Sequence, residues 1–263
     1  MTETMTTQGE TPRLRIDDDT WVLVLTGAGV SAESGIRTFR DAGGLWEDYP
    51  VEQVASPGGF AADPALVWRF YSARRAKAKT CAPNPGHRAL AAIEDRLGDR
   101  FLLATQNVDG LHGQAGNRRV VEIHGSLFLT RCSGCTRPPF PDDREYPDGP
   151  PKCDECAARG RTSLLRPHIV WFGEMLDPED LLRIGSFLDQ ARRHRLVFLA
   201  VGTSGVVYPA AGMVLEARAA GAETWLVNAE PADNARHFHH FVEGPSGRVL
   251  PALFGEAPGA VTR

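Results

Sequence analysis

The sequence predicts an α/β fold, a parallel Rossmann-like sheet with helices on both faces, joined to a smaller lobe. Four apolar, β-branched stretches alternate with segments of helix-forming composition, which is the pattern of a parallel sheet covered on both faces. Each stretch runs directly into small or polar residues, and ligands of such sheets bind beyond the carboxyl ends of the strands. Two further segments, residues ~41–92 and ~126–165, do not fit the sheet and are predicted to form the lobe.

The four predicted strands lie within "WVLVLTGAGVS" from residue 21, "FLLATQNVD" from 101, "RLVFLAVGTS" from 195 and "ETWLVNAE" from 223. Continuous apolar runs of this kind are typical of strands that are buried on both faces. The carboxyl ends of these stretches carry the small or polar residues Gly27-Ala28-Gly29, Gln106-Asn107-Val108-Asp109, Gly202-Thr203-Ser204 and Asn228-Ala229-Glu230. Turn chemistry explains any one of these groups but explains four together poorly, so we expect a ligand site at this edge of the sheet.

The chain divides into a discontinuous large domain and two insertions. We expect the large domain in residues 21–40, 93–125 and 166–254, a helical insertion in 41–92 and a second, cysteine-bearing insertion in 126–165. Residues 1–20 are polar and acidic and are predicted to be a disordered tail, and residues 255–263 form a C-terminal tail.

The net charge of −4 over 263 residues gives no bulk attraction to nucleic acid or to an anionic membrane, although basic protein tails remain possible partners. The longest apolar run, "LVFLAVG", is far shorter than the roughly 20 residues of a membrane span. The first 20 residues contain no apolar segment typical of a secretion signal. We therefore expect a cytoplasmic protein, as a monomer, without a nucleic-acid or membrane partner.

Four of the five cysteines form two Cys-x-x-Cys pairs, and the fifth is Cys81. Two such pairs separated by a short linker are typical of a structural zinc ribbon, in which four thiolates close a tetrahedral coordination shell. The linker "TRPPFPDDREYPDGPPK" cannot build a core, so the metal is expected to supply much of its folding energy. Disulfides or chance are the alternatives. The predicted zinc ligands are Cys132, Cys135, Cys153 and Cys156.

The turn "GAGVSA" (27–32) is similar to the G-x-G-x-x-G/A pattern that brings backbone N–H groups against a pyrophosphate. A redox Rossmann domain places a strand ending in Asp or Glu about 20 residues later. Here the chain continues "ESGIRTFRDAGGLWEDYP", which is polar and not strand-like. The turn therefore predicts a dinucleotide, but not the usual hydride-transfer arrangement.

Seven motifs in order resemble the sirtuins, a family of NAD-dependent protein-lysine deacylases. They are "GAGVSAESGIRTFRDAGGLW", "TQNVDGLH", "IHGS", the four cysteines, "LLRPHIVWFGE", "GTSGVVYPAA" and "NAEP", and they span residues ~21–253. The resemblance implies a Rossmann-like domain and a small zinc-bearing lobe, with NAD and an acyl-lysine peptide entering the cleft between them. NAD is consumed there, and the products are free lysine, nicotinamide and O-acyl-ADP-ribose.

The resemblance also implies roles for individual residues. His124 matches the catalytic base, and its near-neutral pKa suits that role, although a buried structural histidine is the alternative. Asn107 matches a residue that contacts the nicotinamide side and helps to hold water. The other implied cofactor contacts are Gly27, Ala28, Gly29, Ser31, Ala32, Thr38, Phe39, Arg40, Trp46, Gln106, Asp109, Gly202, Thr203, Ser204, Asn228, Glu230 and Ser246. The segments "WFGE" (171–174) and "VVYP" (206–209) resemble the strands that flank the substrate peptide, with Phe172, Gly173, Glu174, Val206 and Val207 as contacts.

Tyr71 and Arg74 lie three residues apart and therefore share a face of the predicted helix. In one branch of the sirtuins a Tyr-x-x-Arg motif at this position accompanies a preference for succinyl, malonyl or glutaryl groups, because guanidinium and phenol together bind a carboxylate. The form "GIRTFR" is typical of the same branch, whose bacterial members often also deacetylate. A surface helix with a solvated arginine is the alternative, and Arg75 should point away from the pocket.

The sequence alone leaves two other functions open. A mono-ADP-ribosyltransferase would modify a protein acceptor, and a non-catalytic NAD sensor or zinc scaffold would not turn over at all. His87 and His112 are interpreted as structural, and the histidines of "RHFHHF" (236–241) as an exposed helix face.

Overall fold

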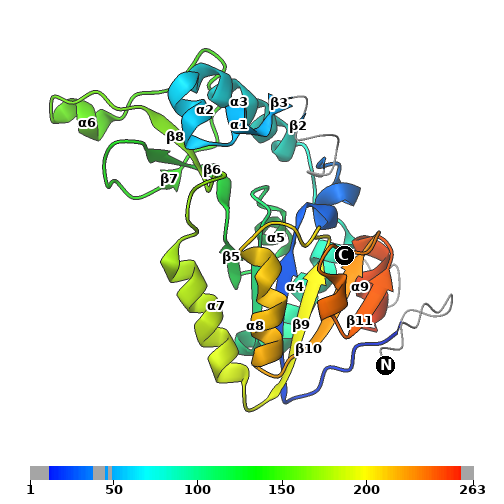
Figure 1. Cartoon of the computed structure of the whole chain (residues 1–263). Coiled ribbons are helices and arrows are strands. Elements are labelled where there is room, and N and C mark those ends of the chain that lie inside the picture. The colour runs from blue at the N-terminus through cyan, green and yellow to red at the C-terminus, as the bar shows by residue number, and fades with distance from the viewer. Residues whose placement is uncertain (1–11, 38–44, 47–48, 256–263) are drawn as a thin grey trace.

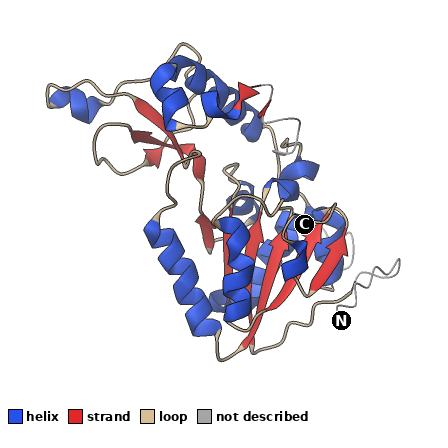
Figure 2. Cartoon of the chain, in the orientation of Figure 1, coloured by secondary structure: helices blue, strands red, loops and turns tan. Residues whose placement is uncertain are grey.

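The computed structural model describes residues 12–37, 45–46 and 49–255. A six-stranded parallel sheet forms the large domain in the order β11-β10-β9-β1-β4-β5 (Figure 2). Its strands are β1 Thr20–Thr26, β4 Phe101–Thr105, β5 Val120–Glu122, β9 Arg195–Val201, β10 Glu223–Asn228 and β11 His240–Glu243. The predicted fold class is confirmed, with β5 and β11 as additional edge strands.

Alternate residues of the central strands face two separate apolar cores, one on each side of the sheet. On one face Leu23 and Leu25 pack with α7 and α8, and on the other Val22 and Val24 pack with α4 and α9. Because both faces are covered, β1 is apolar along almost its whole length. The helices are α4 Pro85–Leu97, α5 Leu111–Ala115, α7 Pro178–Ala191, α8 Met213–Ala219 and α9 Ser246–Leu253, with 3-10 turns at Ala28–Ser34, Gly98–Arg100, Ala210–Gly212 and Ala235–His237.

The small lobe lies beyond one end of the sheet (Figure 1). Residues of the helical segment and of the cysteine-bearing segment share one apolar core, which also contains Trp171. The lobe contains β2 Leu45–Trp46, β3 Tyr49–Pro50, α1 Val51–Val54, α2 Pro57–Ala62, α3 Pro64–Lys79, β6 Gly125–Cys132, β7 Phe140–Pro141, α6 Asp154–Ala158 and β8 Leu165–Ile169. Neither segment could bury its apolar side chains alone, so the two fold against each other.

The boundaries differ from the sequence prediction in two places. Residues 85–92 belong to α4, whose Ala89 and Leu90 pack in a large-domain core rather than in the small lobe. Asn84 caps this helix and Pro85 occupies its first turn, so the chain re-enters the large domain earlier than expected. The boundary expected at residue 166 falls inside β8, because β8 pairs with β6 in the small-lobe sheet.

The prediction of a disordered tail is wrong for residues 12–19. Leu14 is buried, and its N–H donates to the Leu253 carbonyl at 2.8 Å. Arg96 and Arg100 donate to the carbonyls of Ile16 and Asp18 at 2.6 Å. Leu14 and Ile16 pack on the core beside α9, and these hydrogen bonds fix the segment in place. Residues 1–11 and 256–263 lie outside the described residues.

The histidines of residues 236–241 do not form a helix face. His237 ends the 3-10 turn Ala235–His237, His239 precedes β11, and His240 begins β11, the parallel edge strand beside β10. The ring of His240 stacks on Trp225 and its Nε2 lies 3.0 Å from Glu223. Within the described residues, no helix is long and apolar enough to cross a membrane.

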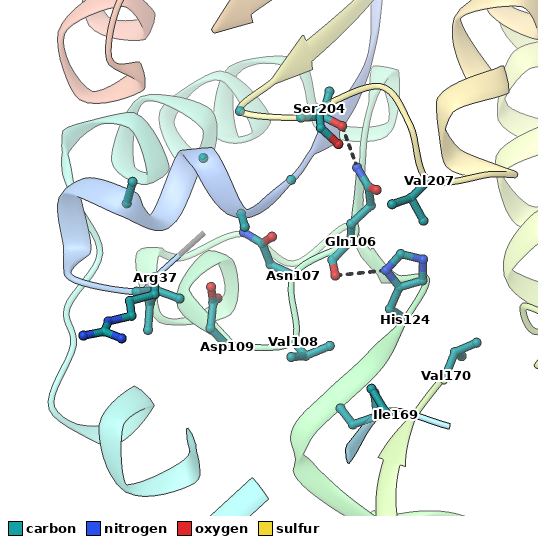
Figure 3. A pocket seen from close by; sticks show the side chains of 18 of the residues that line it. Arg37, Gln106, Asn107, Val108, Asp109, His124, Ile169, Val170, Ser204 and Val207 are labelled. Carbon is teal, nitrogen blue, oxygen red and sulfur yellow. Dashed lines mark hydrogen bonds between the residues drawn. The ribbon is translucent and has the colours of Figure 1, made fainter. Parts of the chain in front are cut away.

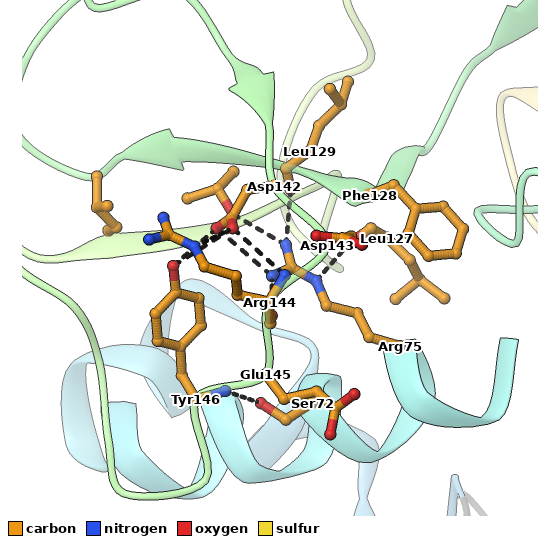
Figure 4. Close-up of polar contacts among 12 residues, drawn as sticks. Ser72, Arg75, Leu127, Phe128, Leu129, Asp142, Asp143, Arg144, Glu145 and Tyr146 are labelled. Carbon is orange, nitrogen blue, oxygen red and sulfur yellow. Dashed lines mark hydrogen bonds and ion pairs between the residues drawn. The ribbon is translucent and has the colours of Figure 1, made fainter. Parts of the chain in front are cut away.

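A buried guanidinium connects α3 to the cysteine-bearing segment. The Arg75 side chain is fully buried and donates to the carbonyls of Leu127 at 2.6 Å and Arg144 at 2.7 Å (Figure 4). It also donates to the Thr130 hydroxyl at 2.9 Å and lies 3.6 Å from the Asp142 carboxylate. As expected, Arg75 points away from the side of α3 that carries Arg74. The two parts of the small lobe are therefore joined by a charge that water cannot reach.

The Asp142 carboxylate is the counter-charge of this cluster. Burial raises the pKa of Asp142, but hydrogen bonds from Arg144 and Thr130 outweigh burial and hold it below the ordinary value. Asp142 is therefore ionised at neutral pH, and the ion pair with Arg75 contributes stability that is lost as the pH falls through the lowered pKa.

We expect the substitution Arg75→Met to lower the free energy of unfolding by about 3–5 kcal/mol, because it leaves a buried carboxylate and several carbonyls without their donor. Chemical denaturation followed by fluorescence measures this loss. Arg69→Met is the matched control, since Arg69 lies exposed on the same helix. Equal losses in the two variants would show that the buried network does not join the lobe.

Candidate active site

The carboxyl ends of four parallel strands open onto one cavity of about 750 Å³ between the two lobes. The four residue groups predicted at these strand ends come together there, although they are far apart in the sequence. The cofactor residues predicted from sequence that line the cavity are Gly27, Ala28, Gly29, Ala32, Gln106, Asn107, Asp109, Gly202, Thr203, Ser204, Asn228, Glu230 and Ser246. Thr38, Phe39 and Arg40 lie outside the described residues, as does the side chain of Trp46, whose backbone belongs to β2.

Two glycine turns pack directly against each other on the cavity wall. The Gly29 N–H donates to the Gly202 carbonyl at 2.8 Å, and a Cβ on Gly29 would lie 2.7 Å from the Gly202 Cα. Gly202 has φ +61, and a Cβ there would lie 2.2 Å from the nitrogen of Val30. Only glycine fits at both positions. The wall is therefore bare backbone, which suits close contact with a phosphate-bearing ligand.

The turn after β4 carries a buried polar cluster. The Ser31 hydroxyl donates to Asp109 at 2.8 Å and accepts from the Asn107 amide at 3.1 Å. Burial raises the pKa of Asp109, while hydrogen bonds from the Leu111 N–H and from Ser31 limit the rise. Ser31 itself lies beneath the cavity rather than on its surface, so its role in this structure is to hold the two cavity-lining side chains.

His124 lines the cavity from the crossing between β5 and β6. Its Nδ1 lies 3.2 Å from the Gln106 carbonyl oxygen (Figure 3). A carbonyl only accepts hydrogen bonds, so Nδ1 carries the proton and Nε2 keeps its lone pair. Burial lowers the pKa of His124 below its ordinary value, and the bond to Gln106 opposes the shift. The ring is therefore a neutral base with a fixed tautomer at cellular pH.

Two other buried histidines support the neighbouring turns. His87 accepts the Asn84 N–H at the start of α4, and its Nε2 lies 3.3 Å from Ser31. His112 lies 2.9 Å from the Thr26 hydroxyl at the end of β1. Burial lowers the pKa of His87 to about 4 and that of His112 to about 3, so both rings are neutral. Their structural interpretation from sequence agrees with these contacts.

Tyr71 and Arg74 line the same cavity from α3. Tyr71 is fully buried, and its hydroxyl accepts the Trp171 indole N–H at 2.9 Å. Burial raises the pKa of Tyr71 to about 12, despite the opposing charge of Arg74, so the phenol stays protonated. The Arg74 guanidinium lies 5.9 Å from the centre of the Tyr71 ring. A hydroxyl donor and a guanidinium therefore lie together at the small-lobe end of the cavity.

The segments expected as strands beside the substrate are turns and loops. In residues 171–174, Gly173 has φ +87 and the Glu174 N–H donates to the Trp171 carbonyl at 2.9 Å, which closes a turn. Residues 206–209 also form no strand in this chain. Phe172, Gly173, Glu174 and Val207 line the cavity, whereas Val206 is exposed and does not.

Several lining residues were not named individually as contacts from the sequence, although some of them lie in segments predicted to form the site. They include Ile36, Arg37, Ala55, Val108, Ile169, Val170, Trp171, Leu176, Tyr208, Pro209, Val227, Ala229, Gly244 and Pro245. Arg37 and Trp171 lie inside the motifs "GIRTFR" and "WFGE". Their place in these motifs indicates that they lie close to the site. Ala55 and Gly244 follow from the packing of distant segments, and no local pattern marks them.

The four predicted metal ligands come together at the far end of the small lobe. Their sulfurs lie within 4.8 Å of one another, with 3.7 Å between Cys132 and Cys156 and 3.9 Å between Cys135 and Cys153. Thiolates bound to tetrahedral zinc at ~2.3 Å lie roughly 3.8 Å apart, so the four side chains fit one zinc ion. These separations are too long for disulfides, and all five cysteines are free. Cys81 lies outside the cluster.

Comparison with known proteins gives the same family throughout. The model of the Sir2 family matches residues 27–209. An NAD-dependent protein deacylase of Caulobacter vibrioides is 49% identical over 239 residues, covering 88% of this chain and 94% of that protein. One of Salmonella typhimurium is 48% identical over 233 residues, covering 88% and 81%. The solved structure of a Sir2 homolog with NAD is 41% identical with a TM-score of 0.79, covering 89% and 87% of the two chains.

We expect the purified chain to contain one zinc ion and the variant Cys153→Ser to contain none, as measured by plasma mass spectrometry. Loss of the ion removes the link that closes the cysteine-bearing segment, so the free energy of unfolding should fall by at least about 3 kcal/mol. Cys81→Ser is the control and should keep both its metal and its stability. Full zinc content in Cys153→Ser would contradict the four-sulfur site.

Proposed function

The chain belongs to the Sir2 family, and we propose that it is an NAD-dependent deacylase of protein lysine side chains. The observation that carries this proposal is a single cavity with two chemically different ends. One end is lined by bare glycine backbone and strand-end polar groups, and the other by Tyr71 and Arg74. His124 lines the cavity as a neutral base. A dinucleotide and an acyl-lysine entering from opposite sides would meet there.

The cofactor residues divide by strand end. In this proposal the turn Gly27–Gly29 meets the phosphates, and Gly202, Thr203 and Ser204 meet the adenosine side. Asn228, Glu230 and Ser246 line the adenine end, and Asn228 is oriented by its own hydrogen bond to the Thr203 carbonyl at 2.9 Å. Gln106, Asn107 and Asp109 face the nicotinamide side, where Asn107 and Asp109 are held by Ser31. When bound, NAD supplies the ADP-ribose that accepts the acyl group, with release of nicotinamide.

His124 takes a proton in the proposed reaction. Its Nε2 lone pair is available because Nδ1 is committed to the Gln106 carbonyl. A base that is neutral at cellular pH accepts a proton from a ribose hydroxyl without first losing its own. The pKa of His124 is lowered by burial, so this capacity persists to mildly acid pH and is lost only as the pH falls through that lowered pKa.

Tyr71 and Arg74 give the proposed preference for succinyl and malonyl groups. A guanidinium and a phenol that stays protonated both donate to a carboxylate, and burial strengthens such charge-assisted bonds. An acetyl group fills the same channel but makes neither bond, so we propose that deacetylation accompanies deacylation. The backbones of residues 171–174 and 206–209 are proposed to pair with the substrate peptide, which would convert two loops into a short sheet.

The zinc ribbon is proposed as a scaffold without a chemical role. Four thiolates leave zinc no open position for water or substrate. Cys132 ends β6, and the neighbouring Arg131 on that strand contacts Glu174 at 3.1 Å on the cavity wall. The ion would therefore fix the strand that supports the substrate side of the cavity.

We expect the wild type to remove succinyl and acetyl groups from one lysine peptide only when NAD is present, as measured by mass spectrometry with detection of O-acyl-ADP-ribose. The double variant Tyr71→Phe/Arg74→Met should lose about 100-fold in kcat/KM for the succinyl peptide and change less than about 3-fold for the acetyl peptide, because two bonds to a charged group are lost. Acetyl removal alone would refute the carboxylate preference. ADP-ribose attached to the peptide would indicate a transferase, and no turnover an NAD sensor.

We expect His124→Ala to abolish deacylation while NAD binding is retained, as measured by calorimetry and turnover on the acetyl peptide. In the wild type, kcat should stay level between pH 6.5 and 8 and fall only below the ordinary histidine pKa, since the neutral base is the active form. His194→Ala, at an exposed histidine, is the control and should change neither quantity. An inflection of kcat above pH 6.5 would contradict the lowered pKa.

A further inference from the structure

A partly buried ionic cluster lies beside the Tyr71 end of the cavity. The Glu174 carboxylate accepts hydrogen bonds from Arg166 at 2.7 and 2.9 Å and from Arg131 at 3.1 Å. Arg131 and Arg166 lie directly opposite each other on β6 and β8, where two like charges repel. Glu174 offsets this repulsion. We call Arg131, Arg166 and Glu174 the Glu174 cluster.

The Glu174 cluster fixes Trp171 from two sides. The Trp171 backbone N–H donates to the Glu174 carboxylate at 2.9 Å. The Arg166 guanidinium carbon lies 3.3 Å from the centre of the Trp171 ring, which is a close cation–π stack. Arg166 also donates to the Ile169 carbonyl at 2.8 Å, so it cannot move without breaking the strand end. Trp171 is 2% exposed and has one orientation available.

The free end of the Trp171 indole reaches the substrate pocket. Its Nε1–H donates to the Tyr71 hydroxyl at 2.9 Å, and both residues line the cavity. A phenol oxygen that accepts this bond keeps one hydrogen to donate. An indole N–H cannot accept that hydrogen, so the phenol must turn it away from Trp171. The Tyr71 hydroxyl can therefore donate this hydrogen to an anionic ligand in the pocket.

We propose that Trp171, held by the Glu174 cluster, is a positioning residue that orients the Tyr71 hydroxyl toward the terminal carboxylate of the acyl group. This inference rests on the proposed function and adds the source of its selectivity. Without the indole N–H, the Tyr71 hydroxyl is free to rotate, and its hydrogen is no longer held ready for the ligand. Binding of a carboxylate-bearing group weakens, while binding of an acetyl group, which takes no bond from Tyr71, does not.

The test is the substitution Trp171→Phe, which keeps an aromatic ring for Arg166 and removes the indole N–H. We expect KM for the succinyl peptide to rise about 5- to 10-fold, within the range of one neutral hydrogen bond, with kcat nearly unchanged. The acetyl peptide should change less than about 2-fold. Trp68→Phe is the matched control, because the indole of Trp68 is equally buried in the same lobe but donates to the Leu165 carbonyl. Its succinyl-to-acetyl ratio should equal that of the wild type.

A double-mutant cycle with Tyr71→Phe separates orientation from packing. If Trp171 acts through the Tyr71 hydroxyl, Trp171→Phe should cause no further loss of selectivity in the Tyr71→Phe background. A fully additive cycle, or equal losses for succinyl and acetyl peptides, would overturn the inference and leave the proposed function intact. A wild type that removes only acetyl groups would overturn both.

A second variant guards against misfolding of Trp171→Phe. Replacing the indole of Trp171 with a benzothiophene, through 3-benzothienylalanine, keeps the shape of the ring system and replaces the N–H donor with a sulfur that cannot donate. We expect the same 5- to 10-fold rise in KM for the succinyl peptide, with an unchanged melting temperature. Wild-type KM values in this variant would refute the role of the indole N–H.

Discussion

The contact between the glycine turns after β1 and β9 is the constraint on which the cavity depends. These two strands pair in register along their whole length, so their carboxyl ends arrive at the same level. The turns that follow the two strands therefore lie in backbone contact with each other. A Cβ on Gly29 or Gly202 would clash with the opposite turn. Because no side chain separates the turns, the wall is made of peptide groups. The polar residues after β4 and β10 complete it at fixed positions beside this contact.

The small lobe is held by buried charges as well as by its apolar core. Arg75 joins α3 to the segment around Asp142, and Arg166 joins β8 to the turn at Glu174. Each buried guanidinium meets a carboxylate together with backbone carbonyls, so the desolvation of the charge is offset by specific bonds. Such networks fix orientation, because a displaced partner leaves a buried charge behind. This explains how a segment rich in proline and aspartate is fixed against α3.

The histidines around the cavity show how burial assigns different tasks to one residue type. His87 and His112 are enclosed and make hydrogen bonds to neighbouring groups, and burial keeps them neutral while they hold turns in place. His124 differs because its Nδ1 faces a carbonyl while the ring lines the cavity. The same imidazole therefore has a structural role where both sides are covered and a chemical role where one side opens to a ligand.

Much of the site was determined by the sequence alone, because its motifs are local. The residues of each strand-end turn are contiguous, and the spacing of the Cys-x-x-Cys pairs carries the zinc site, so both could be predicted without coordinates. The helical spacing of Tyr71 and Arg74 placed them on one face for the same reason.

Only the tertiary structure decided which surroundings these residues meet. Residues 85–92 belong to the large domain because α4 packs on α9, residues 12–19 are ordered because Leu14 finds a buried position, and Trp171 reaches Tyr71 across 100 residues of sequence. Contacts of this kind depend on how distant segments pack, and no local pattern of residues encodes them.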